Sequence, residues 1–172
     1  MADKFQTLEN GKAKLVEATT VSTGVAEAGD IIATDSTGKI DISLLPSGIG
    51  ADVAMIEASG DISGGSYIQI FENLGSPEIR LADNSNGRNA DGFIIDAVTD
   101  GNLATVYFEG SNTGLTGLTV GSRQYLGLNG LPTETPLDPN NPANVGKIHQ
   151  FLGKAINATT INTDTDDCVL IG

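Results

Sequence analysis

From residue 51 onward, the chain alternates between short apolar runs and clusters of Gly, Asn, Asp and Pro. Several runs have period two, so that Ile68 and Ile70 would lie on one face of a strand and Tyr67 on the other. Short runs bounded by turn-forming residues predict β-strands, and helical spacing is scarce. The pattern predicts an all-β fold, a small antiparallel β-barrel or sandwich. The expected strands are residues 53–59, 66–72, 78–82, 92–98, 104–110, 123–128, 149–156 and 168–172.

Two connections between these runs carry recognisable turn chemistry. Asn73, Gly75 and Pro77 predict a hairpin turn, because they adopt turn geometry that β-branched residues avoid. Residues 131–146 contain four of the six prolines and predict a long, extended surface loop. Since long loops in compact domains usually have a function, we expect this loop to contact a neighbour.

Residues 1–50 have a different pattern and predict an extended N-terminal β-arm. Residues 12–23 alternate β-branched and polar positions, and residues 29–46 resemble two short strands around a Ser-Thr-Gly turn. The segment has too few apolar residues to bury a core alone. It must therefore pair with the barrel, with a sister subunit or with another protein, and unpaired strand edges favour oligomerisation. We predict an arm over residues 1–50 and a β-barrel domain over residues 51–172.

The composition limits both the core and the partners. Of the 172 residues 39% are hydrophobic, only 5% are aromatic and none is Trp, so we expect a core of Ile, Leu, Val and Ala. The formal net charge of −13 disfavours nucleic acid, whose affinity for proteins comes mainly from Lys and Arg. Lys4, Lys12 and Lys14 make the N-terminus the least acidic part. This region either contacts an acidic partner or is a solvated terminus.

The sequence offers no membrane span and no secretory leader. The first residues lack an apolar h-region, and no run approaches eighteen apolar residues. We expect a soluble protein made in the cytoplasm. The lone Cys168 excludes an internal disulfide, and its place in a terminal strand predicts a buried structural thiol.

Candidate catalytic and metal-binding groups are sparse, and we expect neither enzymatic activity nor a cofactor. The single histidine, His149, would need Cys168 and carboxylates to complete a zinc site, and no Gly-x-Ser-x-Gly motif is present. Asp96, Asp100 and Glu109 flank strands as a glycosidase pair could, but with 22 acidic residues such coincidences are expected.

Two further segments have simpler interpretations. Residues 162–167, Asn-Thr-Asp-Thr-Asp-Asp, lack the central Gly and terminal Glu of a calcium-binding loop, which favours a solvated acidic turn. Residues 110–121 are glycine-rich, but they lack the Gly-Lys-Ser/Thr ending of a phosphate-binding loop and predict a β-connection.

Several segments resemble known viral proteins. Residues 28–52, AGDIIATDSTGKIDISLLPSGIGAD, resemble the N-terminal region of a group of tailed-bacteriophage and prophage structural proteins. Residues 91–101, residues 104–127 and the closing strand also resemble that group. GSRQYLG, FLGKAI and the terminal CVLIG also resemble small capsid cement proteins. The resemblance covers nearly the whole chain.

The resemblance implies a head decoration or cement protein in the virion, bound to the outer capsid surface. Its partner would be the major capsid protein, and it would form a homo-oligomer, a dimer or trimer, without nucleic acid or membrane. Because Gly-Lys-Ile-x-x-Ser-Leu-Leu-Pro segments also resemble the head-proximal ends of phage fibres, a fibre or tail-associated structural or adhesin protein is the alternative. The chain lacks the long repetitive shaft of a fibre.

We place the expected capsid or intersubunit contact in residues 1–50. Leu44, Leu45 and Pro46 would form a docking knuckle, because Pro46 ends any helical turn there. Alternatively, Leu44 and Leu45 fill the protein's own core. The expected contact residues are Lys12, Lys14, Leu15, Ile40, Ile42, Leu44, Leu45 and Pro46.

Overall fold

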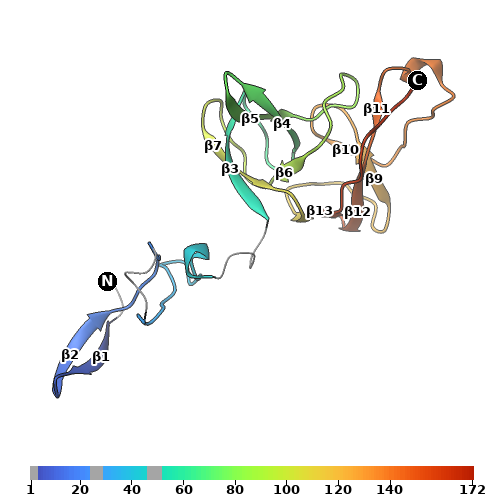
Figure 1. Cartoon of the computed structure of the whole chain (residues 1–172). Coiled ribbons are helices and arrows are strands. Elements are labelled where there is room, and N and C mark those ends of the chain that lie inside the picture. Colours follow the sequence, from blue (N-terminus) through green and yellow to red (C-terminus); the bar gives the residue numbers. More distant parts are fainter. Residues whose placement is uncertain (1–3, 24–28, 46–51) are drawn as a thin grey trace. The chain divides into compact units, whose positions relative to one another are not determined.

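The computed structural model divides into two units, Met1–Gly50 (the N-terminal unit) and Ala51–Gly172 (the barrel unit). The structure describes all residues except 1–3, 24–28 and 46–51 (Figure 1). The prediction of an all-β fold is confirmed. In the described ranges the strands are joined by loops and by the 3-10 helices η2 (Ile42–Leu44) and η3 (Pro142–Asn144).

Five strands of the barrel unit close into a barrel in the order β3-β5-β4-β6-β7. Every neighbouring pair is antiparallel except β3 and β5, which are parallel. The expectation of a wholly antiparallel barrel is therefore wrong in one pair, because five strands cannot alternate in direction around a closed ring. The barrel strands are β3 (Val53–Ala58), β4 (Tyr67–Asn73), β5 (Ser76–Leu81), β6 (Gly92–Ile94) and β7 (Leu103–Tyr107).

The hairpin between β4 and β5 forms where it was predicted, but with a different turn. Asn73 pairs with Ser76, so the turn consists of Leu74 and Gly75 alone. Both have positive φ, 49° and 89°, as a two-residue turn that matches strand twist requires. Pro77, expected in the turn, lies in β5 instead. Positive φ is unfavourable for Leu74, whose side chain is 98% exposed.

A second, five-stranded antiparallel sheet has the order β10-β9-β12-β13-β8, and β11 pairs with β14. The expected strand 104–110 ends at Tyr107, and β13 begins before the segment that was expected to be an acidic turn. The pattern missed β13 because Ile161 is its only large apolar residue. These strands are β8 (Gly110–Asn112), β9 (Arg123–Leu126), β10 (Pro132–Thr133), β11 (Ile148–His149), β12 (Phe151–Asn157), β13 (Thr160–Thr163) and β14 (Val169–Leu170).

Two hydrophobic cores share the barrel strands. The first core fills the barrel, and the second lies between the barrel and the second sheet. Successive residues of β4 enter different cores, with Ile68 in the first and Tyr67 in the second, and β6 repeats this with Ile94 and Phe93. The predicted alternation is therefore confirmed, but both faces are buried. The first core contains Ile56, Ala58, Ile62, Ile68, Ile79, Ile94, Ala104 and Val106, and the second contains Tyr67, Ala82, Ala90, Phe93, Leu115, Leu126, Ile148, Leu152 and Ile161.

Aromatic side chains anchor the second core, contrary to the expectation of a purely aliphatic interior. Tyr67 and Phe93 are fully buried, with ring centroids 6.0 Å apart, and Phe93 stacks on Tyr107 at 5.5 Å. The Tyr67 hydroxyl hydrogen-bonds the Thr163 hydroxyl at 3.0 Å and so links β4 to β13. Burial raises the pKa of Tyr67 to about 12.

In the N-terminal unit, β1 (Lys4–Glu9) and β2 (Lys12–Glu17) form an antiparallel hairpin. The two strands expected in residues 29–46 are absent from the described part of that segment, which contains turns, η2 and a single bridge between Ile32 and Thr19. Local bonds compete with the sheet, because the Asp35 carboxylate accepts hydrogen bonds from the Thr37 hydroxyl and from the backbone of Lys39. The Thr37 hydroxyl is also the main reason that the pKa of Asp35 is lowered.

Candidate interaction surfaces

The N-terminal unit exposes its apolar side chains. None of its described residues is buried. Leu8 is 74% exposed and Leu15 69%. These residues therefore form no core of their own. The exposed large apolar residues of this unit are Leu8, Leu15, Val21, Ile31, Ile32, Ile40 and Leu45.

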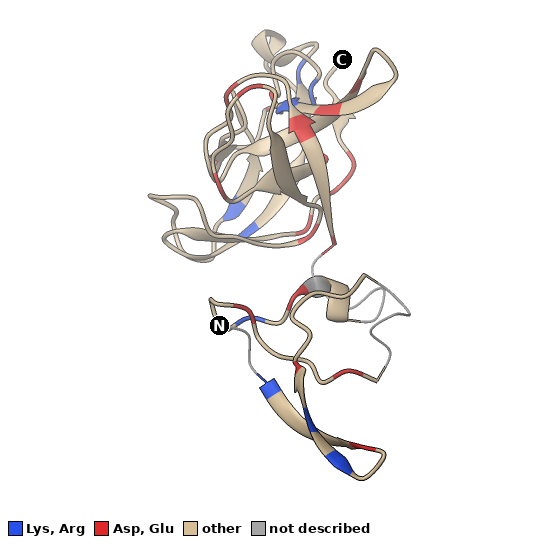
Figure 2. Cartoon of the chain, turned by 90° about the vertical axis from the view of Figure 1, so that its left-hand side faces the viewer, with Lys and Arg blue, Asp and Glu red and all other residues tan. Residues whose placement is uncertain are grey.

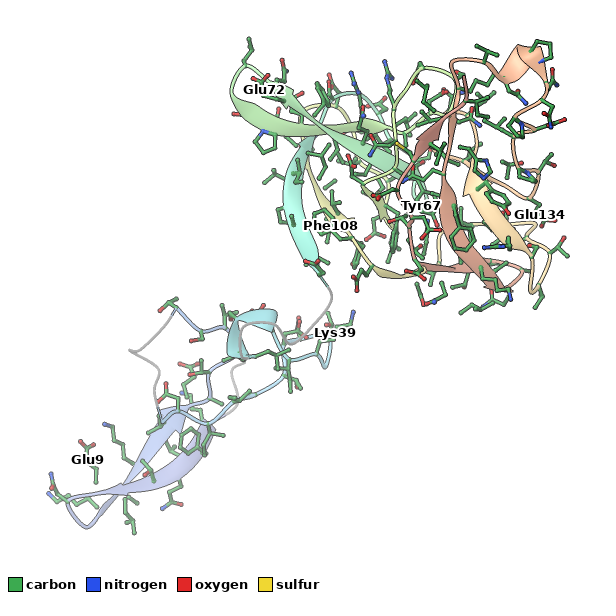
Figure 3. All side chains as sticks on the ribbon, turned by 45° about the vertical axis from the view of Figure 1, so that its right-hand side comes forward. Glu9, Lys39, Tyr67, Glu72, Phe108 and Glu134 are labelled. Atoms are coloured by element: carbon green, nitrogen blue, oxygen red, sulfur yellow. The ribbon has the colours of Figure 1, made fainter. Side chains whose placement is uncertain are left out.

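The β1–β2 hairpin has two different faces. Leu8 pairs with Ala13, and Leu15 follows two residues later, so these three lie on one face, the hairpin apolar face, where Gln6 pairs with Leu15. The half-buried pair Phe5–Val16 lies on the opposite face. The opposite face also has the ion pair between Lys14 and Glu9, 2.6 Å apart, whose hydrogen bond lowers the pKa of Glu9. Figure 3 shows Glu9 near the tip of this hairpin.

The structure places the predicted contact residues in two groups. On the hairpin, Lys12 and Lys14 are exposed on the face opposite Leu15. Around η2, Leu44 is half-buried and Leu45 is 37% exposed.

Three other predicted contact residues are described only in part. Ile40 is 53% exposed. Ile42 belongs to η2, but its side chain lies outside the described parts, as does Pro46. The docking knuckle therefore stays a prediction. Leu8 was not predicted as a contact residue, although the β-forming residues Phe5 and Thr7 at period two could have indicated a strand there.

In the barrel unit, the prediction of a buried thiol at Cys168 is wrong. Cys168 is exposed, not buried, because β14 pairs with β11 alone, and Val169 and Leu170 are 61% and 66% exposed. Among the described residues, no three His, Cys, Asp or Glu side chains are grouped so that they could hold a metal ion. The candidate carboxylate of Asp100 accepts a hydrogen bond from the backbone of Gly60 and so organises a loop.

Aromatic and basic side chains gather on one face of the second sheet. Phe151 pairs with Tyr125 across β12 and β9, and Lys154 pairs with Arg123 two rungs away. The Arg123 guanidinium lies 4.9 Å from the centre of the Phe151 ring, and the Tyr125 ring is 4.9 Å from His149. We call Arg123, Tyr125, His149, Phe151 and Lys154 the aromatic–basic strip.

A groove of about 600 Å³ lies beside this strip. Thr133 lines it and pairs with Tyr125, and Lys147 lines it two residues before His149. The proline-rich loop forms its outer wall. Its lining residues are Asn84, Gly127, Leu128, Leu131, Pro132, Thr133, Thr135, Pro136, Leu137, Asp138, Asn141, Asn144 and Lys147.

No helix of the described residues is long and apolar enough to cross a membrane. No protein-family profile matches the sequence. No curated protein is similar to it in sequence.

Among solved structures, the chain is similar to the N base of the head fiber gp8.5 of bacteriophage phi29. The two share 15% identity over 72% of this chain and 95% of that chain, with a TM-score of 0.46.

Proposed function

We propose that this chain is a structural protein of a tailed-phage virion that attaches through its N-terminal unit and presents the barrel unit to solvent. Its role is decoration of the outer capsid surface, where it stabilises the shell by bridging subunits, without catalysis. The observation that carries the proposal is the N-terminal unit, which exposes seven large apolar side chains and buries none of its described residues. The phage context comes from the sequence resemblance of residues 28–52.

The energetics of the hairpin support attachment through this unit. A two-stranded hairpin is marginally stable in water without further packing. Covering its apolar face would contribute about 25 cal/mol for each Å² of apolar surface buried. Leu8 and Leu15 are exposed on that face, so a partner that covers them stabilises both the contact and the hairpin. Bridging contacts then stabilise the shell by mass action.

The distribution of charge supports the same orientation. The barrel unit has five basic and fifteen acidic residues, whereas residues 1–50 have four and seven. Figure 2 shows the acidic residues spread over several strands and loops of the barrel unit. Like charge keeps barrel units soluble and apart, whereas the nearly neutral hairpin meets its partner with little repulsion.

The test is a binding experiment with purified capsids and the full-length protein. We compare the wild type with a Leu8→Asp, Leu15→Asp variant by co-sedimentation and electron cryomicroscopy. Leu74→Asp is the matched control, since Leu74 is 98% exposed on the barrel unit. We expect regular density on the capsid lattice for the wild type and the control and its loss in the double variant. All three proteins should unfold at similar temperatures, because the mutated side chains are exposed.

Two results would contradict this proposal. Undiminished binding by the double variant would show that the hairpin apolar face does not mediate attachment. Density at the neck or tail instead of the lattice would favour the fibre role, for which the resemblance of residues 38–46 to fibre segments is the present support. Light scattering of the free protein gives its oligomeric state, for which we expect a dimer or trimer.

A further inference from the structure

The aromatic–basic strip is unlike the rest of the barrel unit. Only five residues of the barrel unit are Lys or Arg, and two of them, Arg123 and Lys154, are cross-strand neighbours on the face that forms the strip. Both are exposed, and the single histidine lies on the same face. In a unit with fifteen acidic residues, this grouping creates a local site for negative charge.

The strip combines these cations with aromatic ring surface. Tyr125 and Phe151 are half-buried, with ring centroids 6.0 Å apart in an edge-to-face arrangement. Arg123 lies over the Phe151 ring, which fixes the guanidinium at the surface and leaves its remaining N–H groups for a ligand. Rings and a guanidinium side by side recognise a ligand that is both flat-faced and anionic.

The groove extends this surface. Because Thr133 lines the groove and pairs with Tyr125 across β10 and β9, the groove adjoins the strip. Leu128 and Leu131, at its lining, are 55% and 57% exposed. The Lys147 ammonium donates to the Asn144 amide oxygen at 3.1 Å and retains further donors. The ligand that fits is therefore extended, with more than one anionic group.

We propose that the strip and groove bind an acidic polysaccharide, one that has carboxylates on its sugar rings. Its carboxylates pair with Arg123, Lys154 and Lys147, and a sugar face packs on Tyr125. This inference concerns the barrel unit and is independent of the attachment proposed for the N-terminal unit.

Two other ligand classes fit the same surface less well. An extended peptide would add a strand to the edge of the sheet, but the edge strand β10 has only two residues, and Pro132 lacks an N–H. A nucleic acid would bring one phosphate for each nucleotide against the acidic remainder of the unit. A sugar polymer has a lower charge density and offers apolar faces.

The test measures binding of the full-length protein to polygalacturonate fragments by isothermal titration calorimetry. Neutral dextran, oligo-dT and polyglutamate serve as comparison ligands. We expect saturable binding to polygalacturonate that weakens at higher ionic strength, and no comparable binding to the other three. Binding that is equal for oligo-dT or polyglutamate would overturn the proposal in favour of a general anion surface, and absence of polygalacturonate binding would overturn it entirely.

Variants connect the binding to the strip. Arg123→Gln should weaken affinity about tenfold, the loss expected of one charge-assisted hydrogen bond. The matched control is Arg80→Gln, because the Arg80 guanidinium lies 4.4 Å from the centre of the Phe71 ring in the same type of pair on the barrel. Lys154→Gln should also weaken binding, and because the Lys154 side chain is exposed, this substitution should leave the protein folded. Equal affinities of wild type, Arg123→Gln and Lys154→Gln would refute the assignment.

Discussion

The Tyr67 hydroxyl links the barrel to the second sheet, and its removal tests the two-core architecture. In Tyr67→Phe the ring stays in the second core, but the bond to Thr163, 3.0 Å long, is lost. At neutral pH we expect the free energy of unfolding to fall by about 1 kcal/mol, because the Thr163 hydroxyl loses a buried partner.

The same substitution has the opposite effect in alkali. Burial of the ring raises the pKa of Tyr67 in the folded protein from its ordinary value of 10.0 to about 12. Because its pKa is raised, neutral Tyr67 makes its full contribution to the free energy of unfolding below pH ~10, and this contribution is lost as the pH rises toward ~12. A difference of two pKa units corresponds to a loss of about 2.7 kcal/mol. Tyr67→Phe escapes this loss and should become the more stable protein above pH ~11.

Urea unfolding followed by circular dichroism, at neutral pH and at several alkaline values, measures both effects. Thr163→Val is the informative companion, since it removes the same hydrogen bond and keeps the ionisable phenol. It should lose stability at neutral pH yet retain the alkaline decline. If the free energies of unfolding of wild type and Tyr67→Phe decline in parallel above pH ~10, then Tyr67 is not kept neutral by burial, and the reasoning is refuted.

Three further predictions concern the barrel unit. Gly153→Ala should lower the free energy of unfolding by about 2 kcal/mol or more, because the glycine has φ +145° and an added Cβ would clash with the Asn162 carbonyl oxygen. Gly172→Ala, in open space, should leave the free energy of unfolding unchanged in the same urea titration. Burial raises the pKa of Asp83, but its hydrogen bonds outweigh that effect and lower it overall, so its stabilisation is present above pH ~4 and lost as the pH falls. Asp83→Asn should therefore reduce stability at neutral pH and flatten its acid dependence, and identical acid profiles would contradict this. Cys168 is exposed, so one thiol should react with a disulfide reagent in the native protein, whereas protection until unfolding would indicate burial.

The sequence determined those features of the barrel unit that depend on near neighbours in the chain. Period-two runs predicted β4 and its hairpin partner, because adjacent residues must face opposite sides of a strand. Even there, Gly75 lies in the turn as predicted, but Asn73 and Pro77 lie in the strands. Leu74 adopts positive φ, which its side chain disfavours, since the pairing of Asn73 with Ser76 leaves room for only two turn residues.

For the candidate interaction surfaces, the sequence did not show which side chains share a face. The scarcity of apolar residues in 1–50 predicted a segment without its own core, yet Leu8 was overlooked and Lys12 was grouped with Leu15, which the register places on the opposite face. The aromatic–basic strip has no sequence signature. Arg123 and Lys154 are thirty-one positions apart and become neighbours only when β9 pairs with β12.

Tertiary structure alone decided what the second face of each barrel strand contacts. Tyr67 and Ile68 are both buried because a second sheet covers the barrel, and alternation in one strand cannot reveal a cover built from residues far along the chain. The parallel pairing of β3 with β5 and the exposure of Cys168 also depend on which distant strands pair with each other. Local pattern specifies which way side chains alternate, whereas long-range pairing determines which of those faces is covered.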